Sequence, residues 1–404
     1  MRILYLHQYF NTPSMSGSTR SYETARHLVA AGHRVDIITT WRDATDKRGW
    51  YLTNEDGIWV HWLPVRYSNY QSYAQRIGAF LKFAVAAARR AASIPADVVF
   101  ASSTPLTIVL PAIYARWRSR IPMVFEVRDL WPEVPIAMGA LRSPLTRWLA
   151  RRLEKLAYSS SAAIIALSPD MKAGVVASGV DAARISVVPN GSDLFLSSES
   201  TQDARSRIRN QLGIGANDIV LLYAGTLGQV NDVGYLVEVA AALPHGSNIK
   251  ILVVGDGRET ERVQLMAREH GVLGRNFFMC GRVPKSAMAG YLSAGDIVVS
   301  TVLPIPALEA NCANKVFDGL AAGKCIAINH GGWLEALLLE NRVGVRLSQN
   351  LDHAAATLLA LAAEPDWVRE AGLRASALAR TRFSRDALAK QVELVLDGVV
   401  RASR

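Results

Sequence analysis

Short apolar runs alternate along this chain with segments of helical period, and this alternation constrains the possible folds more than any other feature. Residues 18–33 show the helical kind, because Tyr22, Ala25 and Leu28 share one face of a helix. The strand-like runs of the first half lie at residues 2–7, 34–40, 98–102, 122–127 and 162–168. They lack polar alternation, as expected for parallel strands buried on both faces. The pattern predicts the α/β class, with doubly wound parallel sheets.

The pattern pauses once and then restarts, which predicts a second domain of the same kind. Residues 187–207 are rich in serine and other polar residues, as is typical of a connection between domains. Strand and helix patterns resume at residue 218. With 404 residues, the chain also exceeds the size of one hydrophobic core. We expect Rossmann-like domains at residues 1–195 and 205–383, with a long amphipathic helix at residues 384–404.

The composition narrows the class of protein and its partners. Hydrophobic residues make up 50% of the chain and charged residues 20%, which describes a globular protein. Its three cysteines form no CxxC pair, so a disulfide framework or a zinc site is disfavoured and a reducing compartment is expected. The formal net charge of +10 favours anionic partners. No zinc finger, helix-turn-helix or RNA-recognition signature is present, so we expect no nucleic acid partner.

Two loops of the first domain carry candidate site residues. Gly17 and Ser18 lie where backbone N–H groups at a helix N-terminus can hold a phosphate, although an ordinary loop explains them equally. Arg128 and Asp129 directly follow the strand-like run 122–127. Ligands of open α/β sheets bind at the carboxyl ends of strands, so Asp129 is a candidate base toward an acceptor hydroxyl. A structural ion pair between Arg128 and Asp129 is the alternative.

Glycine loops follow two expected strands of the second domain. One loop holds Gly225, Thr226 and Gly228, and the other holds Gly255 and Gly257. Glycines let a backbone approach a diphosphate closely, although tight turns also account for part of this pattern. Neither loop is the full GxGxxG fingerprint, and no acid follows at the offset expected for NAD ribose binding. A nicotinamide dehydrogenase is therefore disfavoured.

The stretch ANKVFDGLAAGK at residues 313–324 places charge at the start of a helix built from small residues. Asn314 and Lys315 lie at its beginning, and Asp318 follows about one turn later. We expect Lys315 to neutralise a diphosphate and Asp318 to accept hydrogen bonds from the hydroxyls of a ribose. The small residues after Asp318 let the helix lie close to the sheet. Stabilisation of the helix N-terminus by Asp318 is an equal alternative.

Taken in order, these motifs resemble glycosyltransferase family 4, whose members are retaining transferases with the GT-B fold. The resemblance covers nearly the whole chain and includes GSTRSYETARHLVAAGH, ISVVPNGSD, LLYAGTLG, VVGDG and NKVFDGLAAGK. It implies two Rossmann-like domains that face each other across a cleft, with the C-terminal helix packing back on the first domain. EVRDLWPE and NKVFDGLAAGK look most like the branch that adds N-acetylated amino sugars, such as fucosamine, in O-antigen or capsule assembly.

The resemblance also implies roles for single residues. Gly17 falls in the loop that approaches the donor phosphate, and Asp129 falls where many relatives carry a catalytic-site His or Asp. Arg282 and Val283 match positions whose backbone holds the nucleobase. Asp318 aligns with the second, ribose-binding acid of the E-x7-E motif.

Two departures from the family pattern concern charge. The first acid of the E-x7-E motif falls at Ala310, with Glu309 one residue early, so the usual contact to the sugar is in doubt. The segment GTLGQVNDVG lacks the usual Arg and Lys, so Lys315 is the candidate replacement for that positive charge.

Two basic amphipathic segments at residues 73–93 and 141–160 indicate contact with a membrane surface. No uninterrupted apolar stretch is long enough to span a bilayer. The residues concerned are Arg76, Lys82, Arg89, Arg90, Arg147, Trp148, Arg151 and Arg152. In this family they lie on the acceptor side, where a polyprenyl-diphosphate acceptor would be anionic. Ordinary surface helices are the alternative.

The function expected is transfer of a sugar, of N-acetylhexosamine type, from a UDP-sugar to a lipid-linked, lipopolysaccharide or capsule glycan. Such a hexosyltransferase would act on the inner face of the cytoplasmic membrane, without a metal or other cofactor, since no DxD motif is present. A non-catalytic nucleotide-sugar-binding subunit is an alternative, and so is a nucleotide-sugar epimerase or hydrolase.

Overall fold

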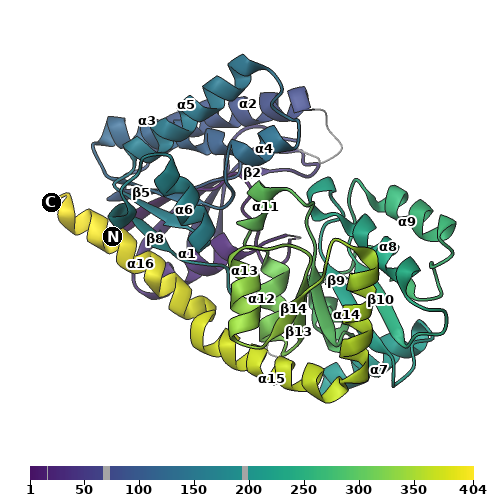
Figure 1. Cartoon of the computed structure of the whole chain (residues 1–404). Helices are drawn as coiled ribbons and strands as arrows, with labels where there is room; N and C mark the ends of the chain where they lie inside the picture. Colours follow the sequence, from purple (N-terminus) through teal and green to yellow (C-terminus); the bar gives the residue numbers. More distant parts are fainter. Residues whose placement is uncertain (16, 67–72, 193–198) are drawn as a thin grey trace. The chain divides into compact units, whose positions relative to one another are not determined.

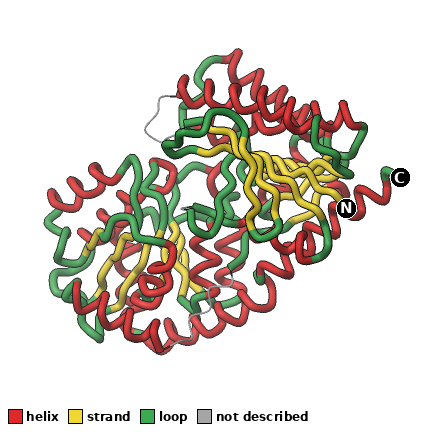
Figure 2. Tube along the Cα trace, turned by 180° about the vertical axis from the view of Figure 1, so that it is seen from behind, coloured by secondary structure: helices red, strands yellow, loops and turns green. Residues whose placement is uncertain are grey.

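A computed structural model describes residues 1–15, 17–66, 73–192 and 199–404 (Figure 1). The chain forms two compact units, each built around its own sheet. The first unit comprises Met1–Asn190, Ala310–Cys312 and Arg385–Arg404, and the second comprises Gly191–Glu309 and Ala313–Ser384. Figure 2 shows each sheet in yellow, flanked by helices in red.

The first unit contains an eight-stranded sheet in the order β3-β4-β2-β1-β5-β6-β7-β8. All neighbouring strands pair in parallel except β3 and β4, an antiparallel hairpin at one edge that the sequence analysis does not predict. The strands are β1 (Arg2–Leu6), β2 (Arg34–Trp41), β3 (Tyr51–Glu55), β4 (Ile58–Pro64), β5 (Val98–Ser102), β6 (Met123–Val127), β7 (Ala163–Ala166) and β8 (Ile185–Val187). The chain reverses its direction across the sheet between β1 and β5, which makes this the topological switch point.

Helices cover both faces of this sheet. They are α1 (Arg20–Ala30), α2 (Tyr73–Ala92), α3 (Val109–Ser119), α4 (Glu133–Ala137), α5 (Pro144–Ser160), α6 (Pro169–Ala177) and α16 (Arg385–Ala402), with short 3₁₀ turns η1 (Leu106–Ile108) and η2 (Ala182–Arg184). Helix α16 packs against α1, and its Leu388, Val392 and Leu396 enter the core formed by alternate residues of the central strands. Helices α2, α3 and α5 lie on the other side (Figure 1).

The second unit contains a fully parallel sheet in the order β11-β10-β9-β12-β13-β14, with its switch point between β9 and β12. The strands are β9 (Ile219–Ala224), β10 (Ile249–Val254), β11 (Phe277–Met279), β12 (Ile297–Ser300), β13 (Cys325–Ile328) and β14 (Gly344–Arg346). The helices are α7 (Glu199–Gln211), α8 (Val233–Ala242), α9 (Thr260–Glu269), α10 (Lys285–Ala294), α11 (Pro306–Glu309), α12 (Asn314–Ala321), α13 (Trp333–Glu340), α14 (Leu351–Ala363) and α15 (Pro365–Arg382), with η3 at Gln229–Asn231.

Helix α12 lies unusually close to the sheet because Gly319 carries no side chain. A Cβ at Gly319 would lie 2.7 Å from Ile326 Cδ1 on β13 and 2.8 Å from Val298 Cβ on β12. The small residues expected to permit a close approach therefore do so, and they fix where the N-terminus of α12 meets the carboxyl edge of the sheet.

Candidate functional site

The switch point of the first sheet carries a buried ion pair between Arg20 and Glu126. The guanidinium of Arg20, at the start of α1, lies 2.9 Å from Glu126 Oε1 on β6. Ser102 Oγ donates a hydrogen bond of 2.6 Å to Glu126 Oε2. Burial opposes ionisation of Glu126, but the charges of Arg20 and Arg128 outweigh it and lower the pKa of the carboxyl. The carboxylate thus stays ionised at the end of β6 and fixes α1 against the sheet.

Arg128 belongs to a second polar group at the same edge. Its Nη1 lies 3.2 Å from His7 Nε2, and its Nη2 lies 3.4 Å from Ser18 Oγ. Ser21 Oγ lies 2.8 Å from His7 Nδ1. Burial and the neighbouring charge of Arg128 hold the pKa of His7 well below its usual range, so the ring is neutral. The structure therefore brings Arg128 and Ser18 together, and Arg128 also contacts a buried histidine that the sequence analysis does not select.

Asp129 follows Arg128 and has a different environment. Thr104 Oγ1 donates a hydrogen bond of 2.9 Å to Asp129 Oδ2. Desolvation raises the pKa of Asp129 above its usual range, against the lowering effects of Thr104 and Arg128. Among the described residues, Arg128 and Asp129 form no ion pair with each other, so the structural alternative considered for them is not observed. Asp129 is exposed just after the carboxyl end of β6, where an acceptor hydroxyl can reach its carboxylate.

The loop before α1 requires a glycine at residue 17. Its φ is +117°, and a Cβ there would lie 2.8 Å from Asn11 Nδ2. That Nδ2 donates a hydrogen bond of 3.2 Å to the carbonyl oxygen of Ser18. A side chain at residue 17 would therefore disturb the loop that presents the N-terminus of α1.

The two glycine loops of the second unit pack against each other. A Cβ on Gly255 would collide with the carbonyl oxygen of Gly225, and one on Gly257 would collide with the backbone of Leu227. Gly255 also donates a backbone hydrogen bond of 2.8 Å to the carbonyl oxygen of Gly281. These glycines thus allow three loops to meet at the carboxyl edge of β9, β10 and β11.

Lys315 lies at the switch point of the second sheet, in the first turn of α12. Its Nζ lies 4.0 Å from the centroid of the Tyr223 ring. A Cβ on Gly225 would lie 3.2 Å from Lys315 Cε, so the glycine leaves room for the lysine side chain. Burial lowers the pKa of Lys315 to about 7. The ammonium is held at the β9 loop by an aromatic ring rather than by a carboxylate among the described residues.

The remaining donor-site candidates lie along the same edge of the second sheet. Thr226 accepts hydrogen bonds at its carbonyl oxygen from Tyr223 (2.8 Å) and Asn231 (2.9 Å). Gly228 precedes η3, Asn314 begins α12, and Asp318 is half-buried one turn further on. Arg282 and Val283 follow β11, with Arg282 exposed.

Glu309, the acid one residue before the expected motif position, is the last residue of α11. The carboxylate of Glu309 lies beside Gly331, where a Cβ would be 3.5 Å from either oxygen. Ala310 is buried, and its carbonyl oxygen accepts a hydrogen bond of 2.7 Å from Ser168 Oγ.

The candidate membrane residues differ in their exposure. Lys82 and Arg89 of α2 are exposed, whereas the Nη2 of Arg90 lies 2.9 Å from His61 Nδ1 inside the unit. The surface role predicted for Arg90 is therefore not supported by its contacts. The side chain of Arg76 lies outside the described residues.

The candidate membrane residues on α5 lie at the surface. Trp148 is 54% exposed, and the guanidinium of Arg152 lies 5.3 Å from its ring. Arg147 donates a hydrogen bond of 2.9 Å to the carbonyl oxygen of Leu141, and Arg151 lies 3.5 Å from Glu133.

Helix α3 adds apolar surface that the sequence analysis misses. Leu110, Tyr114 and Trp117 are exposed at helical spacing, Trp117 by 70%. The spacing of residues 110, 114 and 117, with Arg116 and Arg118 between and beyond, could have indicated this face. No helix in the described part of the chain is long and apolar enough to cross a membrane. Over the same residues, no group of three or more His, Cys, Asp or Glu side chains could hold a metal ion.

Two domain families match the chain. Residues 17–191 match the family described as glycosyl transferase 4-like domain, and residues 204–362 match glycosyl transferases group 1. Between them, the two matches include most candidate residues of both sheets.

Curated relatives have related names. D-inositol 3-phosphate glycosyltransferase of Corynebacterium glutamicum strain R is 28% identical over 196 residues, 47% of this chain and 46% of the relative. The chain thus spans about half the length of that relative. WcaI of Escherichia coli K12, named for colanic acid biosynthesis as a glycosyl transferase, is 22% identical over 77% of this chain and 79% of its own.

Solved structures share the fold over the whole chain. Sucrose-phosphate synthase from Thermosynechococcus elongatus gives a TM-score of 0.79 at 18% identity and covers 99% of both chains. HepE of Anabaena in complex with UDP-glucose gives 0.72 at 17% identity, covering 98% of this chain and 100% of its own. The two units therefore have the GT-B fold.

Proposed function

We propose that this chain, in which a glycosyl transferase 4-like domain precedes a glycosyl transferases group 1 domain, is a glycosyltransferase whose donor is a UDP-sugar. The transferred sugar is of N-acetylhexosamine type, as expected from EVRDLWPE and NKVFDGLAAGK. The reaction retains the configuration of the anomeric carbon. The acceptor is a lipid-linked, lipopolysaccharide or capsule glycan, and the enzyme works as a peripheral protein on the inner face of the cytoplasmic membrane.

The observation that carries this proposal is the position of Lys315. Transfer breaks the bond between the anomeric carbon and the diphosphate oxygen and leaves negative charge on the diphosphate. A half-buried ammonium at the switch point of the second sheet, next to the Gly225 loop, is well placed to stabilise that charge. The N-terminus of α12 adds its dipole at the same place. The neighbour HepE, which has the same fold, is in complex with UDP-glucose.

Other residues of that edge complete the donor site. Asp318, half-buried on α12, accepts hydrogen bonds from the ribose hydroxyls. The backbone of Arg282 and Val283 after β11 holds the base. Glu309, beside Gly331, takes the place of the family's first acid toward the donor sugar. No step requires a metal ion, since cationic side chains and backbone amides carry the charge stabilisation.

The first unit supplies the acceptor side. Asp129, exposed just after β6, accepts the proton of the attacking hydroxyl. The exposed apolar residues of α3 and α5, led by Trp117 and Trp148, lie among arginines. Aromatic side chains next to basic ones are typical of protein surfaces that bind anionic membranes.

The direct test is a transfer assay. The purified protein is incubated with UDP-[14C]N-acetylglucosamine, UDP-[14C]N-acetylgalactosamine or UDP-[14C]glucose and an organic extract of bacterial membranes. We expect label from one of the two N-acetylhexosamine donors in the organic phase, and α configuration of the new linkage by NMR for an α-linked donor. Equal transfer from UDP-glucose would refute the sugar class, and an inverted linkage would refute retention. Label released only as free sugar would refute transfer.

A further inference from the structure

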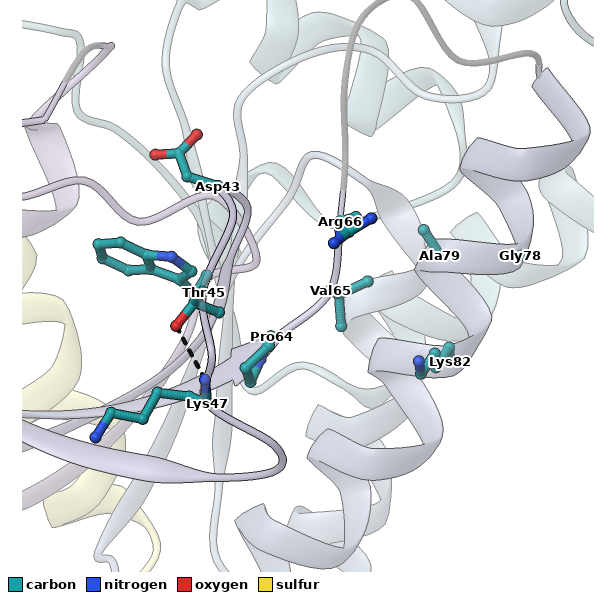
Figure 3. Close-up of a pocket in the computed structure, with 10 residues that line it drawn as sticks. Asp43, Thr45, Lys47, Pro64, Val65, Arg66, Gly78, Ala79 and Lys82 are labelled. Carbon is teal, nitrogen blue, oxygen red and sulfur yellow. Dashed lines mark hydrogen bonds between the residues drawn. The ribbon is translucent and has the colours of Figure 1, made fainter.

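A cavity of about 420 Å³ opens in the first unit at the carboxyl ends of β2 and β4. It lies apart from the polar groups at the switch point of the sheet, beyond β2 toward the sheet edge. One wall consists of Trp41, the last residue of β2, and of Asp43 and Lys47 in the segment that follows. The other wall consists of Arg66 after β4 and of Lys82 in α2 (Figure 3).

Positive charge dominates the cavity. Its lining includes three basic residues, Lys47, Arg66 and Lys82, and one acid, Asp43, and all four are exposed to solvent. Within the described part of the chain none of these three cations forms an ion pair. Three like charges around one cavity repel each other, and an anion bound between them would remove that repulsion. The opening is therefore suited to a group of more than one negative charge.

One wall of the cavity is rigid and the other leaves its opening wide, so that a group could enter and be held in one position. The ring of Trp41 makes an edge-to-face contact with Trp62 at 5.4 Å between centroids, so the indole is held as a rigid wall. On the α2 side, Gly78 and Ala79 leave the opening wide, since no atom lies within 4 Å of a Cβ added at Gly78.

The same turns of α2 also carry a separate apolar stripe. Ile77, Leu81 and Val85 are exposed at spacings of four residues, in the row next to Gly78 and Lys82. An apolar stripe beside a cationic cavity matches the chemistry of a molecule that joins a phosphate to a lipid chain.

From these features, and resting on the function proposed above, we propose that this cavity binds the phosphate or diphosphate group of the acceptor. Lys47, Arg66 and Lys82 hold the anion, and Trp41 limits how far it enters. The acceptor chain, when it is a lipid, leaves along Ile77, Leu81 and Val85. The site thereby selects phosphorylated acceptors.

Binding of inorganic pyrophosphate tests the anion site without a need for activity. Isothermal titration is carried out with saturating UDP present, so that the donor diphosphate site is occupied. We expect the double variant Arg66→Gln/Lys82→Gln to bind pyrophosphate at least roughly tenfold more weakly than the wild type, because two charge-assisted contacts are lost. The matched control Arg268→Gln/Arg369→Gln, with two exposed arginines of the second unit replaced, should bind as the wild type does.

The experiment distinguishes a failure of the proposed anion site from a failure of the proposed donor site. An increase in melting temperature with UDP in both variants shows that they are folded and that the donor site is intact. With that increase present, pyrophosphate binding that is equal in all proteins, or absent from the wild type, would overturn the acceptor site and leave the proposed function standing. A missing UDP effect in the wild type would instead count against the proposed function.

Binding of farnesyl diphosphate distinguishes a lipid-linked acceptor from a soluble phosphorylated acceptor. If the acceptor is lipid-linked, the wild type binds farnesyl diphosphate more tightly than pyrophosphate, and Leu81→Gln/Val85→Gln removes only that difference. Equal affinity for the two probes assigns the site to a soluble phosphorylated acceptor. In activity assays, Arg66→Gln/Lys82→Gln should raise the KM for acceptor at least tenfold and leave the KM for donor unchanged.

Discussion

The ammonium nitrogen of Lys315 lies 4.0 Å from the centroid of the Tyr223 ring. This cation–π contact places a desolvated positive charge where β9 ends and α12 begins. Burial lowers the pKa of Lys315 from 10.5 to about 7. Between those two values the unfolded chain binds more protons at this group, so its contribution to stability rises with pH in that window. Without ligand, the site retains a lysine that is costly to keep charged.

The Lys315 environment predicts that UDP binding takes up a proton. A bound diphosphate favours the charged form and raises the pKa, so at pH 8 we expect an uptake of roughly 0.8 proton per UDP, and little uptake at pH 6. Titration calorimetry in buffers with different ionisation enthalpies measures this number. Lys315→Arg should bind UDP with almost no uptake, because arginine stays charged. Binding without uptake by the wild type at pH 8 would contradict this role for Lys315.

The contact between the glycine loops predicts the effect of Gly255→Ala. The new methyl group would collide with the carbonyl oxygen of Gly225, so the loops must separate. We expect a loss of about 1–3 kcal/mol in the free energy of unfolding, as for other overpacked sites, together with a loss of UDP binding. Thermal melts with and without UDP measure both. Gly398→Ala in α16, where the methyl group meets no atom within 4 Å, should leave UDP binding unchanged and raise the free energy of unfolding by about 0.5–1 kcal/mol, because alanine has the higher helix propensity. A Gly255→Ala protein that matches the wild type would show that the loops are not in contact.

The charge cluster around Asp296 predicts that the stability of the second unit is highly sensitive to substitution of this residue. Asp296 lies 2.7 Å from Arg205 and 2.6 Å from Arg209, and Arg209 is buried. Asp296→Asn leaves these cations uncompensated, at a cost of about 3–5 kcal/mol. Asp366→Asn, which removes the exposed pair with Arg369, should cost at most about 1 kcal/mol. Scanning calorimetry compares the two melting temperatures. Similar small losses in both variants would indicate that the cluster is well solvated.

The exposed aromatic side chains of α3 and α5 predict binding to membranes. We expect sedimentation with phosphatidylglycerol vesicles at low salt, and roughly tenfold weaker binding of Trp117→Ser/Trp148→Ser, because two large apolar side chains no longer enter the interface. The control Leu265→Ser/Leu373→Ser replaces exposed leucines of the second unit and should bind normally. Unchanged sedimentation of the tryptophan variant would assign these helices to ordinary surface.

The inner strands of both sheets could be predicted from the sequence, because parallel strands buried on both faces leave short apolar runs such as residues 98–102 and 249–254. The hairpin of β3 and β4 and the three-residue edge strands β8 and β14 could not. Residues 51–55 lie at the sheet edge with one face exposed, and their pattern is short and mixed.

Site residues could be predicted from the sequence only where they lie at the end of a strand or at the start of a helix. Asp129, Lys315 and the glycine loops have such positions. The pair of Arg20 and Glu126 joins residues 106 positions apart, and nothing in the sequence near either one indicates the other. The same applies to the cavity at Arg66 and Lys82, whose walls come from separate elements.

The central claim is that a UDP-sugar binds at the carboxyl edge of the second sheet, with its ribose at Asp318. A thermal-shift panel of UDP, GDP, ADP, CMP and dTDP tests it most directly, since a ligand raises the melting temperature by mass action. Asp318→Ala and the control Asp352→Ala, an exposed acid of α14, are measured beside the wild type. We predict an increase with UDP alone, which is lost in Asp318→Ala and kept in Asp352→Ala. No increase with any nucleotide, or an equal increase with UDP in all three proteins, would contradict the account.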